Sequence, residues 1–152
     1  MRLSDRVAIV TGGAAGIGRE ISRLFAEEGA KVVIADIDEA GGAETERLIR
    51  DVGGDASFLT TDVSQEPAVK ELVSHAVSTF GPVSVLVNNA AAFVFGKVED
   101  VTDDDWSRGL GVNVIGTSHC VRHVIPSMRQ SGGGAIVNIA SVSSFIAQPG
   151  FI

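Results

Sequence analysis

A cluster of glycines follows a short apolar run near the start of the chain. The apolar run covers residues 7–10, and a segment with helical spacing begins close to residue 17. Glycine has no Cβ, so a backbone built from it can approach a phosphate closely. The helix that follows adds unpaired N–H groups and the positive end of its dipole. This pattern predicts a phosphate-binding turn formed by Thr11, Gly12, Gly16, Ile17 and Gly18.

An acidic residue ends the next apolar run. Asp36 closes residues 31–35 and is followed by Ile37. A carboxylate at this place can accept hydrogen bonds from both hydroxyls of a ribose. It would repel the 2′-phosphate of NADP, which needs a nearby cation, so we expect the cofactor to be NAD. Both features also have a purely structural alternative. The glycines could serve only a tight connection from strand to helix, and Asp36 could simply end its strand or cap the following helix.

Apolar runs alternate with amphipathic segments along the whole chain. This alternation predicts an α/β fold, a Rossmann-like doubly wound parallel sheet with strand order 3-2-1-4-5. A dinucleotide would lie across the carboxyl ends of its strands. We expect strands at about 7–11, 31–36, 56–61, 84–88 and 135–140 and helices at about 17–29, 39–52, 65–80 and 103–130, with a loop at 89–102.

Composition narrows the class of protein further. The 152 residues carry a net charge of −7, which argues against a nucleic-acid partner, because phosphate backbones attract clustered Lys and Arg. No apolar run is long enough to span a membrane. The chain has 1 cysteine and therefore no internal disulfide, which fits a reducing compartment, and we expect a cytoplasmic protein.

Motifs further along the chain have the same order as in a known family. Asp62 and Val63 follow the third expected strand, Asn88-Asn89-Ala90 the fourth and Ser141 the fifth, while Asn113 lies in the long helix. With the Gly-xxx-Gly-x-Gly spacing, these motifs resemble the short-chain dehydrogenase/reductase family over residues 11–141. Ala91 departs from the family pattern by replacing a glycine.

The resemblance implies an oxidoreductase that transfers a hydride between NAD(H) and a secondary alcohol or ketone. It implies catalytic roles for Ser141 and Asn113, the serine orienting the substrate and the asparagine helping to hold a water. It also implies a small-molecule substrate and, for the complete protein, a homo-oligomer. The expected cofactor contacts are Thr11, Gly12, Gly16, Ile17, Gly18, Asp36, Ile37, Asp62, Val63, Asn88, Asn89 and Ala90.

Several of these residues have structural alternatives. Asp62 is also placed to cap the following helix, and the asparagines after the fourth strand are placed to satisfy loop backbone groups. Ser143 and Ser144 lie close enough to Ser141 to be confused with it.

The family's proton acceptor is missing from this sequence. The family places a Tyr about a dozen residues after its serine and a Lys four residues later, but this chain has no tyrosine, and its lysines lie at 31, 70 and 97. A hydroxyl proton needs such an acceptor near neutral pH. We therefore expect residues 1–152 to form a single NAD-binding domain that is incomplete after its fifth strand and inactive alone. The alternative is a non-catalytic dinucleotide-binding or scaffold module.

Two further clusters suggest metal chemistry but lack the spacing for it. His119 and His123 lie one helical turn apart with Cys120 between them, and no third and fourth ligand follows in sequence. The acidic residues 99–105 lack the alternation of a calcium loop and are typical of a helix N-terminus. We therefore expect no metal site, and we expect the histidines to face solvent or a subunit interface.

Overall fold

A five-stranded parallel sheet forms the centre of the computed structural model, which describes residues 1–147 and 149–150. The strand order is β3-β2-β1-β4-β5, so the predicted Rossmann-like sheet is confirmed. The strands are β1 (Val7–Thr11), β2 (Lys31–Asp36), β3 (Ala56–Thr60), β4 (Val85–Asn88) and β5 (Ala135–Asn138). The last strand ends two positions earlier than expected.

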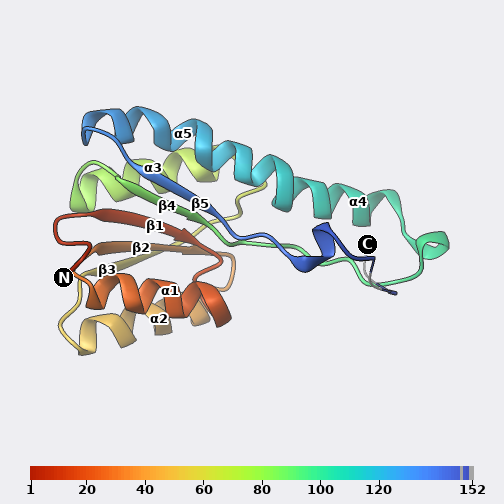
Figure 1. Cartoon of the computed structure of the whole chain (residues 1–152), viewed down its shortest axis with the longest axis horizontal. Helices are drawn as coiled ribbons and strands as arrows, with labels where there is room; N and C mark the ends of the chain where they lie inside the picture. Colours follow the sequence, from red (N-terminus) through yellow and green to blue (C-terminus); the bar gives the residue numbers. More distant parts are fainter. Residues whose placement is uncertain (148, 151–152) are drawn as a thin grey trace.

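Helices cover both faces of this sheet (Figure 1). Helices α1 (Gly16–Glu27) and α2 (Glu39–Asp51) pack on one face, and α3 (Glu66–Phe80) and α5 (Thr117–Gln130) pack on the other. Two apolar clusters result, one on each side of the sheet. The central strands are buried from both sides, which explains why β1, β2 and β4 are nearly continuous apolar runs.

Helix α1 approaches the sheet through small residues. Gly18 and Ser22 are its buried residues, and the Ser22 hydroxyl donates to the Gly18 carbonyl over 2.8 Å. Ile21 and Phe25 pack against the apolar cluster on this face of the sheet, whereas Ile17 and Leu24, at the same helical spacing, are 64% and 48% exposed.

The long helix expected at 103–130 is a continuous helical run with an interruption. Helix α4 (Asp103–Leu110) leads into a π-helical turn, η2 (Gly111–Gly116), and then into α5. Thr102 and Asp105 form a capping box at the start of α4, which confirms the expected helix N-terminus. A short 3-10 helix, η1 (Val98–Asp100), lies in the preceding loop. Within the described residues, no helix is long and apolar enough to cross a membrane.

Candidate dinucleotide site

Thr11 joins the carboxyl ends of the two central strands. Its buried hydroxyl donates to the Val87 carbonyl of β4 over 3.3 Å. The same oxygen accepts from the backbone N–H groups of Asn89 at 3.0 Å and Ala90 at 3.1 Å. A threonine at this position therefore fixes the loop after β4 against the end of β1, where the glycine turn begins.

The side chain of Asn89 hydrogen-bonds to the backbone of the glycine turn. Its side-chain amide donates to the carbonyls of Thr11 at 3.1 Å and Gly12 at 3.0 Å. Gly12 has a φ of +67°, and a Cβ added there would lie 2.8 Å from the Cα of Ala90. Glycine is required here by both backbone conformation and space. Asn89 and Ala90 thus shape the turn, while their contact with a cofactor stays a prediction.

The first turn of α1 is open to an anion. Gly16 has a φ of +52°, and nothing lies within 4 Å of an added Cβ. The N-cap residue, Ala15, makes no side-chain cap, and the first turn contains no acidic residue. A Cβ on Gly18 would lie 2.1 Å from the Gly12 carbonyl oxygen, so the turn and the helix approach closely. The residues present therefore fit a bound pyrophosphate.

Asp36 links the end of β2 to the glycine turn. Its Oδ2 accepts from the Ala14 N–H over 2.9 Å, and its Oδ1 accepts from the Asp38 N–H over 3.0 Å. Asp38, not Asp36, is the N-cap of α2, where it accepts from the Gly41 N–H over 3.1 Å. No described Lys or Arg forms a salt bridge with Asp36, and the neighbouring Ile37 is 72% exposed. The carboxylate is thus oriented without being neutralised.

Asp62 organises the turn that leads into α3. Its Oδ1 accepts from the Ser64 N–H over 2.9 Å and from the Ser64 hydroxyl over 2.7 Å. The N-cap of α3 is Gln65, so Asp62 orders the approach to the helix and does not cap it. Val63 is buried, and its carbonyl lies 3.2 Å from Nδ1 of His119. Contact of this pair with an adenine remains a prediction.

Asn88 lies inside the sheet at the end of β4. Its amide donates to Oδ1 of Asn138 in β5 over 2.8 Å, and its side chain is buried. Its own Oδ1 is buried with no hydrogen-bond partner in the described part of the chain. Asn88 therefore joins the last two strands, which is a structural position beside the site.

The expected catalytic residues are held by different neighbours. Asn113 lies in the π-helical turn, a distortion frequent at functional sites. Its Oδ1 accepts from the Ala92 N–H over 2.8 Å, and its amide donates to the Ala92 carbonyl over 2.9 Å. Ser141 is exposed after β5 and accepts from the Ser143 N–H over 3.2 Å. In the part of the chain that the structure describes, neither side chain hydrogen-bonds to the other.

The loop after β4 contributes to an apolar cavity beside Asn113. Ala92 and Val94 line this cavity, whose volume is about 160 Å³. Phe93 and Phe95 in the same loop are exposed and stack on one another with 6.1 Å between ring centroids. The remaining lining residues come from the end of η1 through α4 to η2, and they are Val101, Asp105, Trp106, Gly109, Leu110 and Val114.

The two histidines of α5 hydrogen-bond to groups of this chain, whereas we expected them to face solvent or a subunit interface. His123 lies 2.8 Å from a carboxylate oxygen of Glu66, at the start of α3, and Arg122 lies 3.2 Å from the same oxygen. The hydrogen bond with His123 is the main cause that lowers the pKa of Glu66. No group of three or more metal-ligating side chains occurs among the described residues.

Two residues beside the glycine turn were not identified from the sequence. Arg19 in α1 donates through Nε to the hydroxyl of Thr45 in α2 over 2.9 Å, and through Nη2 to the Ala14 carbonyl. A cation in the first turn of a helix opposes the helix dipole. That unfavourable placement was the available signal that Arg19 has a specific role.

Comparison with known proteins gives one consistent result. The family model described as short chain dehydrogenase matches residues 6–152. The chain belongs to the short-chain dehydrogenase/reductase family. This agrees with the family indicated by the glycine spacing and by the motifs after the strands.

Relatives and a solved structure support this membership. An uncharacterized oxidoreductase of Thermotoga maritima is 45% identical over 147 residues, covering 97% of this chain and 57% of the relative. The cis-4-hydroxycyclohexanecarboxylate dehydrogenase of Sinomonas cyclohexanicum is 38% identical, and the match covers 95% of this chain and 58% of the relative. A short-chain dehydrogenase/reductase from Burkholderia phymatum, solved in complex with NAD, matches this structure with a TM-score of 0.94 and 35% identity. The match covers 99% of this chain and 54% of the solved chain. The chain thus spans little more than half the length of these short-chain dehydrogenases/reductases.

Proposed function

We propose that this chain is the NAD-binding part of a short-chain dehydrogenase/reductase that interconverts a secondary alcohol and a ketone. The observation that carries the proposal is the anchored carboxylate of Asp36 beside an uncapped, glycine-rich helix start. The helix start suits a pyrophosphate, and the carboxylate suits a ribose with both hydroxyls free. The NAD complex of the Burkholderia phymatum protein supports the same cofactor.

The charge of Asp36 predicts selectivity for NAD over NADP. A 2′-phosphate would meet a carboxylate without a salt-bridge partner among the described residues. We expect NAD to bind at least about tenfold more tightly, which corresponds to roughly 1.4 kcal/mol. Titration calorimetry with each cofactor measures this, and Asp36→Ala should weaken NAD and narrow the difference. Asp51→Asn, on the far end of α2, is the control, and equal affinities in the unaltered protein would contradict the proposal.

The residues around the reaction centre have separate roles in this proposal. Ser141 orients the substrate oxygen through its hydroxyl. The oxygen and the nitrogen of the Asn113 side-chain amide both hydrogen-bond to the Ala92 backbone, so this side chain fixes the loop beside the substrate. In this proposal the backbone of Asn113, and not its side chain, helps to hold the relay water. When bound, NAD accepts the hydride that leaves the alcohol carbon.

The alternative of a binding module is tested by the same preparation. With no tyrosine in these 152 residues, nothing on the chain supplies the family's usual proton acceptor. We expect the chain alone to bind NAD without turning over a panel of secondary alcohols, measured by absorbance of the reduced cofactor. Turnover would contradict the proposed division of roles. Absence of NAD binding would favour a scaffold.

Assembly and location complete the proposal. We infer a homo-oligomer, from the family resemblance, and a cytoplasmic location, from a single cysteine that is buried and free. Light scattering of the complete protein gives its mass in solution, and a monomer would contradict the first inference. Recovery of the protein in a secreted fraction would contradict the second.

A further inference from the structure

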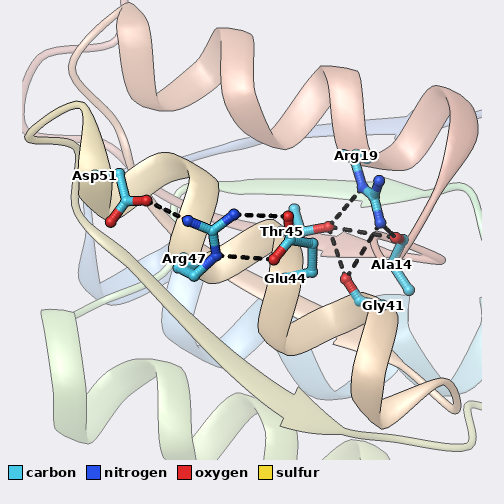
Figure 2. A network of polar contacts seen from close by, with 7 residues as sticks. All are labelled: Ala14, Arg19, Gly41, Glu44, Thr45, Arg47 and Asp51. Carbon is cyan, nitrogen blue, oxygen red and sulfur yellow. Dashed lines mark hydrogen bonds and ion pairs between the residues drawn. The ribbon is translucent and has the colours of Figure 1, made fainter.

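We propose that Arg19 and Thr45 are positioning residues that orient the peptide group between Ala14 and Ala15 for the adenosine half of the dinucleotide. This inference rests on the proposed NAD-binding function and goes beyond it, because neither residue belongs to the glycine turn or to the acid after β2. Figure 2 shows the two side chains meeting between α1 and α2, directed at the Ala14 carbonyl.

The Ala14 carbonyl is held by Arg19, and Thr45 lies beside this contact. The Arg19 guanidinium donates to the carbonyl through Nη2. The Thr45 hydroxyl lies 3.0 Å from the Gly41 carbonyl and 3.3 Å from the Ala14 carbonyl, and its single proton is shared between these two acceptors. Arg19 also donates to Thr45 over 2.9 Å, and its Nη2 lies 3.5 Å from the Gly41 carbonyl. Thr45 is 0% exposed. The hydrogen bond between Thr45 and Ala14 is buried and those of Arg19 are partly buried, and removing one partner of such a bond is costly.

The N–H of Ala14 is held from the other direction. It donates to Oδ2 of Asp36 over 2.9 Å, so the residue is fixed through both of its backbone polar groups. In a trans peptide the C=O and the following N–H point to opposite sides. When the Ala14 carbonyl faces α2, the N–H of Ala15 must face away from α2. Ala15 is exposed and immediately precedes the uncapped first turn of α1, where the pyrophosphate is expected.

The start of α2 is built to approach this peptide closely. A Cβ on Gly41 would lie 3.1 Å from the Ala14 oxygen and 2.4 Å from Oδ2 of Asp38. Ala14 itself is 2% exposed. Glycine at position 41 therefore lets α2 contact the turn, and Arg19 and Thr45 set the geometry of that contact.

Two other roles for Arg19 predict different behaviour. A residue that binds a 2′-phosphate directly would, when removed, weaken NADP more than NAD. A residue that only stabilises the packing of α1 on α2 would, when removed, lower the unfolding temperature without changing the affinity of the folded protein. A positioning residue must change the affinity for NAD itself and for its ADP-ribose fragment.

Titration calorimetry on the protein with NAD and with ADP-ribose tests these roles. We expect Arg19→Gln to weaken both ligands about tenfold, and Thr45→Val to weaken both about threefold, since each loses buried hydrogen bonds to the turn. Arg19→Lys should recover part of the loss, because it restores a charged donor. The matched control is Arg47→Gln: Arg47 lies in the same helix as Thr45 but pairs with the exposed Glu44 and Asp51 (Figure 2).

A second measurement needs no ligand. In Arg19→Gln the amide proton of Ala15 should shift in the NMR spectrum and exchange faster with solvent, whereas Arg47→Gln should leave it unchanged. Unaltered affinity and an unaltered Ala15 amide in Arg19→Gln and Thr45→Val would overturn the inference while leaving the proposed function intact. If the unaltered protein binds neither ligand, the proposed function fails and the effect on affinity fails with it.

Discussion

The glycine-turn region (residues 7–62) and the C-terminal segment (residues 135–146) are built very differently. All of β1 is buried, whereas every residue of β5 is exposed. In the first region a buried polar group binds partners far away in sequence, since the Thr11 hydroxyl accepts from two N–H groups in the loop after β4. In the second, Ser141 hydrogen-bonds to a residue two positions away.

This difference separates recognition of the cofactor from placement of the substrate. Several residues expected to bind NAD, among them Thr11, Asp36 and Asn89, are held by hydrogen bonds to other parts of the described structure. Asn88 of β4, which lies between the two regions in the sheet, binds the C-terminal segment through its hydrogen bond to Asn138. Disturbing the glycine-turn region should therefore cost stability or affinity, while the C-terminal segment should tolerate change.

The largest expected effect comes from adding a methyl group inside the glycine turn. Gly18→Ala places a carbon 2.1 Å from the Gly12 oxygen, so backbone must move, and we expect a loss of about 3 kcal/mol or more in the free energy of unfolding. Urea titration measures this. Gly109→Ala, where the nearest atom is 3.7 Å away, should be neutral or stabilising by up to about 1 kcal/mol. An equal loss of unfolding free energy in both variants would contradict the prediction that the glycine turn is the more tightly packed site.

Removing the Thr11 hydroxyl should have the next largest effect. Thr11→Val keeps the shape of the side chain but leaves the N–H groups of Asn89 and Ala90 without their acceptor. We expect a loss of about 1–3 kcal/mol in the free energy of unfolding. Thr11→Ser retains the hydroxyl and should recover most of it. A Thr11→Val protein as stable as the unaltered one would show that water replaces this hydroxyl.

The carboxylate of Glu66 should make a smaller, pH-dependent contribution. Its pKa is lowered by the hydrogen bond with His123 and by Lys70 and Arg122, so its stabilisation is present above its ordinary pKa and is lost as pH falls through the lowered value. Glu66→Gln should lower the unfolding temperature at pH 7, and the difference should vanish as the pH falls below the lowered pKa of Glu66. Glu71→Gln, on the exposed side of α3, is the control. A difference that does not change with pH would exclude this ion pair as its cause.

The smallest effect is expected in the C-terminal segment. Ser141→Ala removes an exposed hydroxyl whose neighbour is Ser143, so the free energy of unfolding should change by less than about 0.5 kcal/mol. NAD affinity should also be unchanged. A loss above about 1 kcal/mol would show that this segment is as tightly integrated as the glycine turn.

Much of the fold could be predicted because its signals are local. The alternation of apolar runs and helical segments gave the strand order, and Asp36 was correctly placed beside the turn. The exposure of Ile17 and Leu24 could not be predicted, because their helical spacing is the same as that of residues in α1 that pack against the sheet. The partners of His119 and His123 depend on how α5 packs on α3, and spacing within one helix does not encode this.

By itself, the sequence determined the alternation of elements, the family and the type of ligand that the glycine turn suits. These depend on backbone conformations and residue spacings within single segments, such as the positive φ at Gly12 and Gly16. Only the tertiary structure decided that Thr45 of α2 lies beside the contact between Arg19 and the Ala14 carbonyl, and that Asn113 binds the Ala92 backbone. These contacts join segments more distant in sequence, and they form only after the packing of helices on the sheet has brought those segments together.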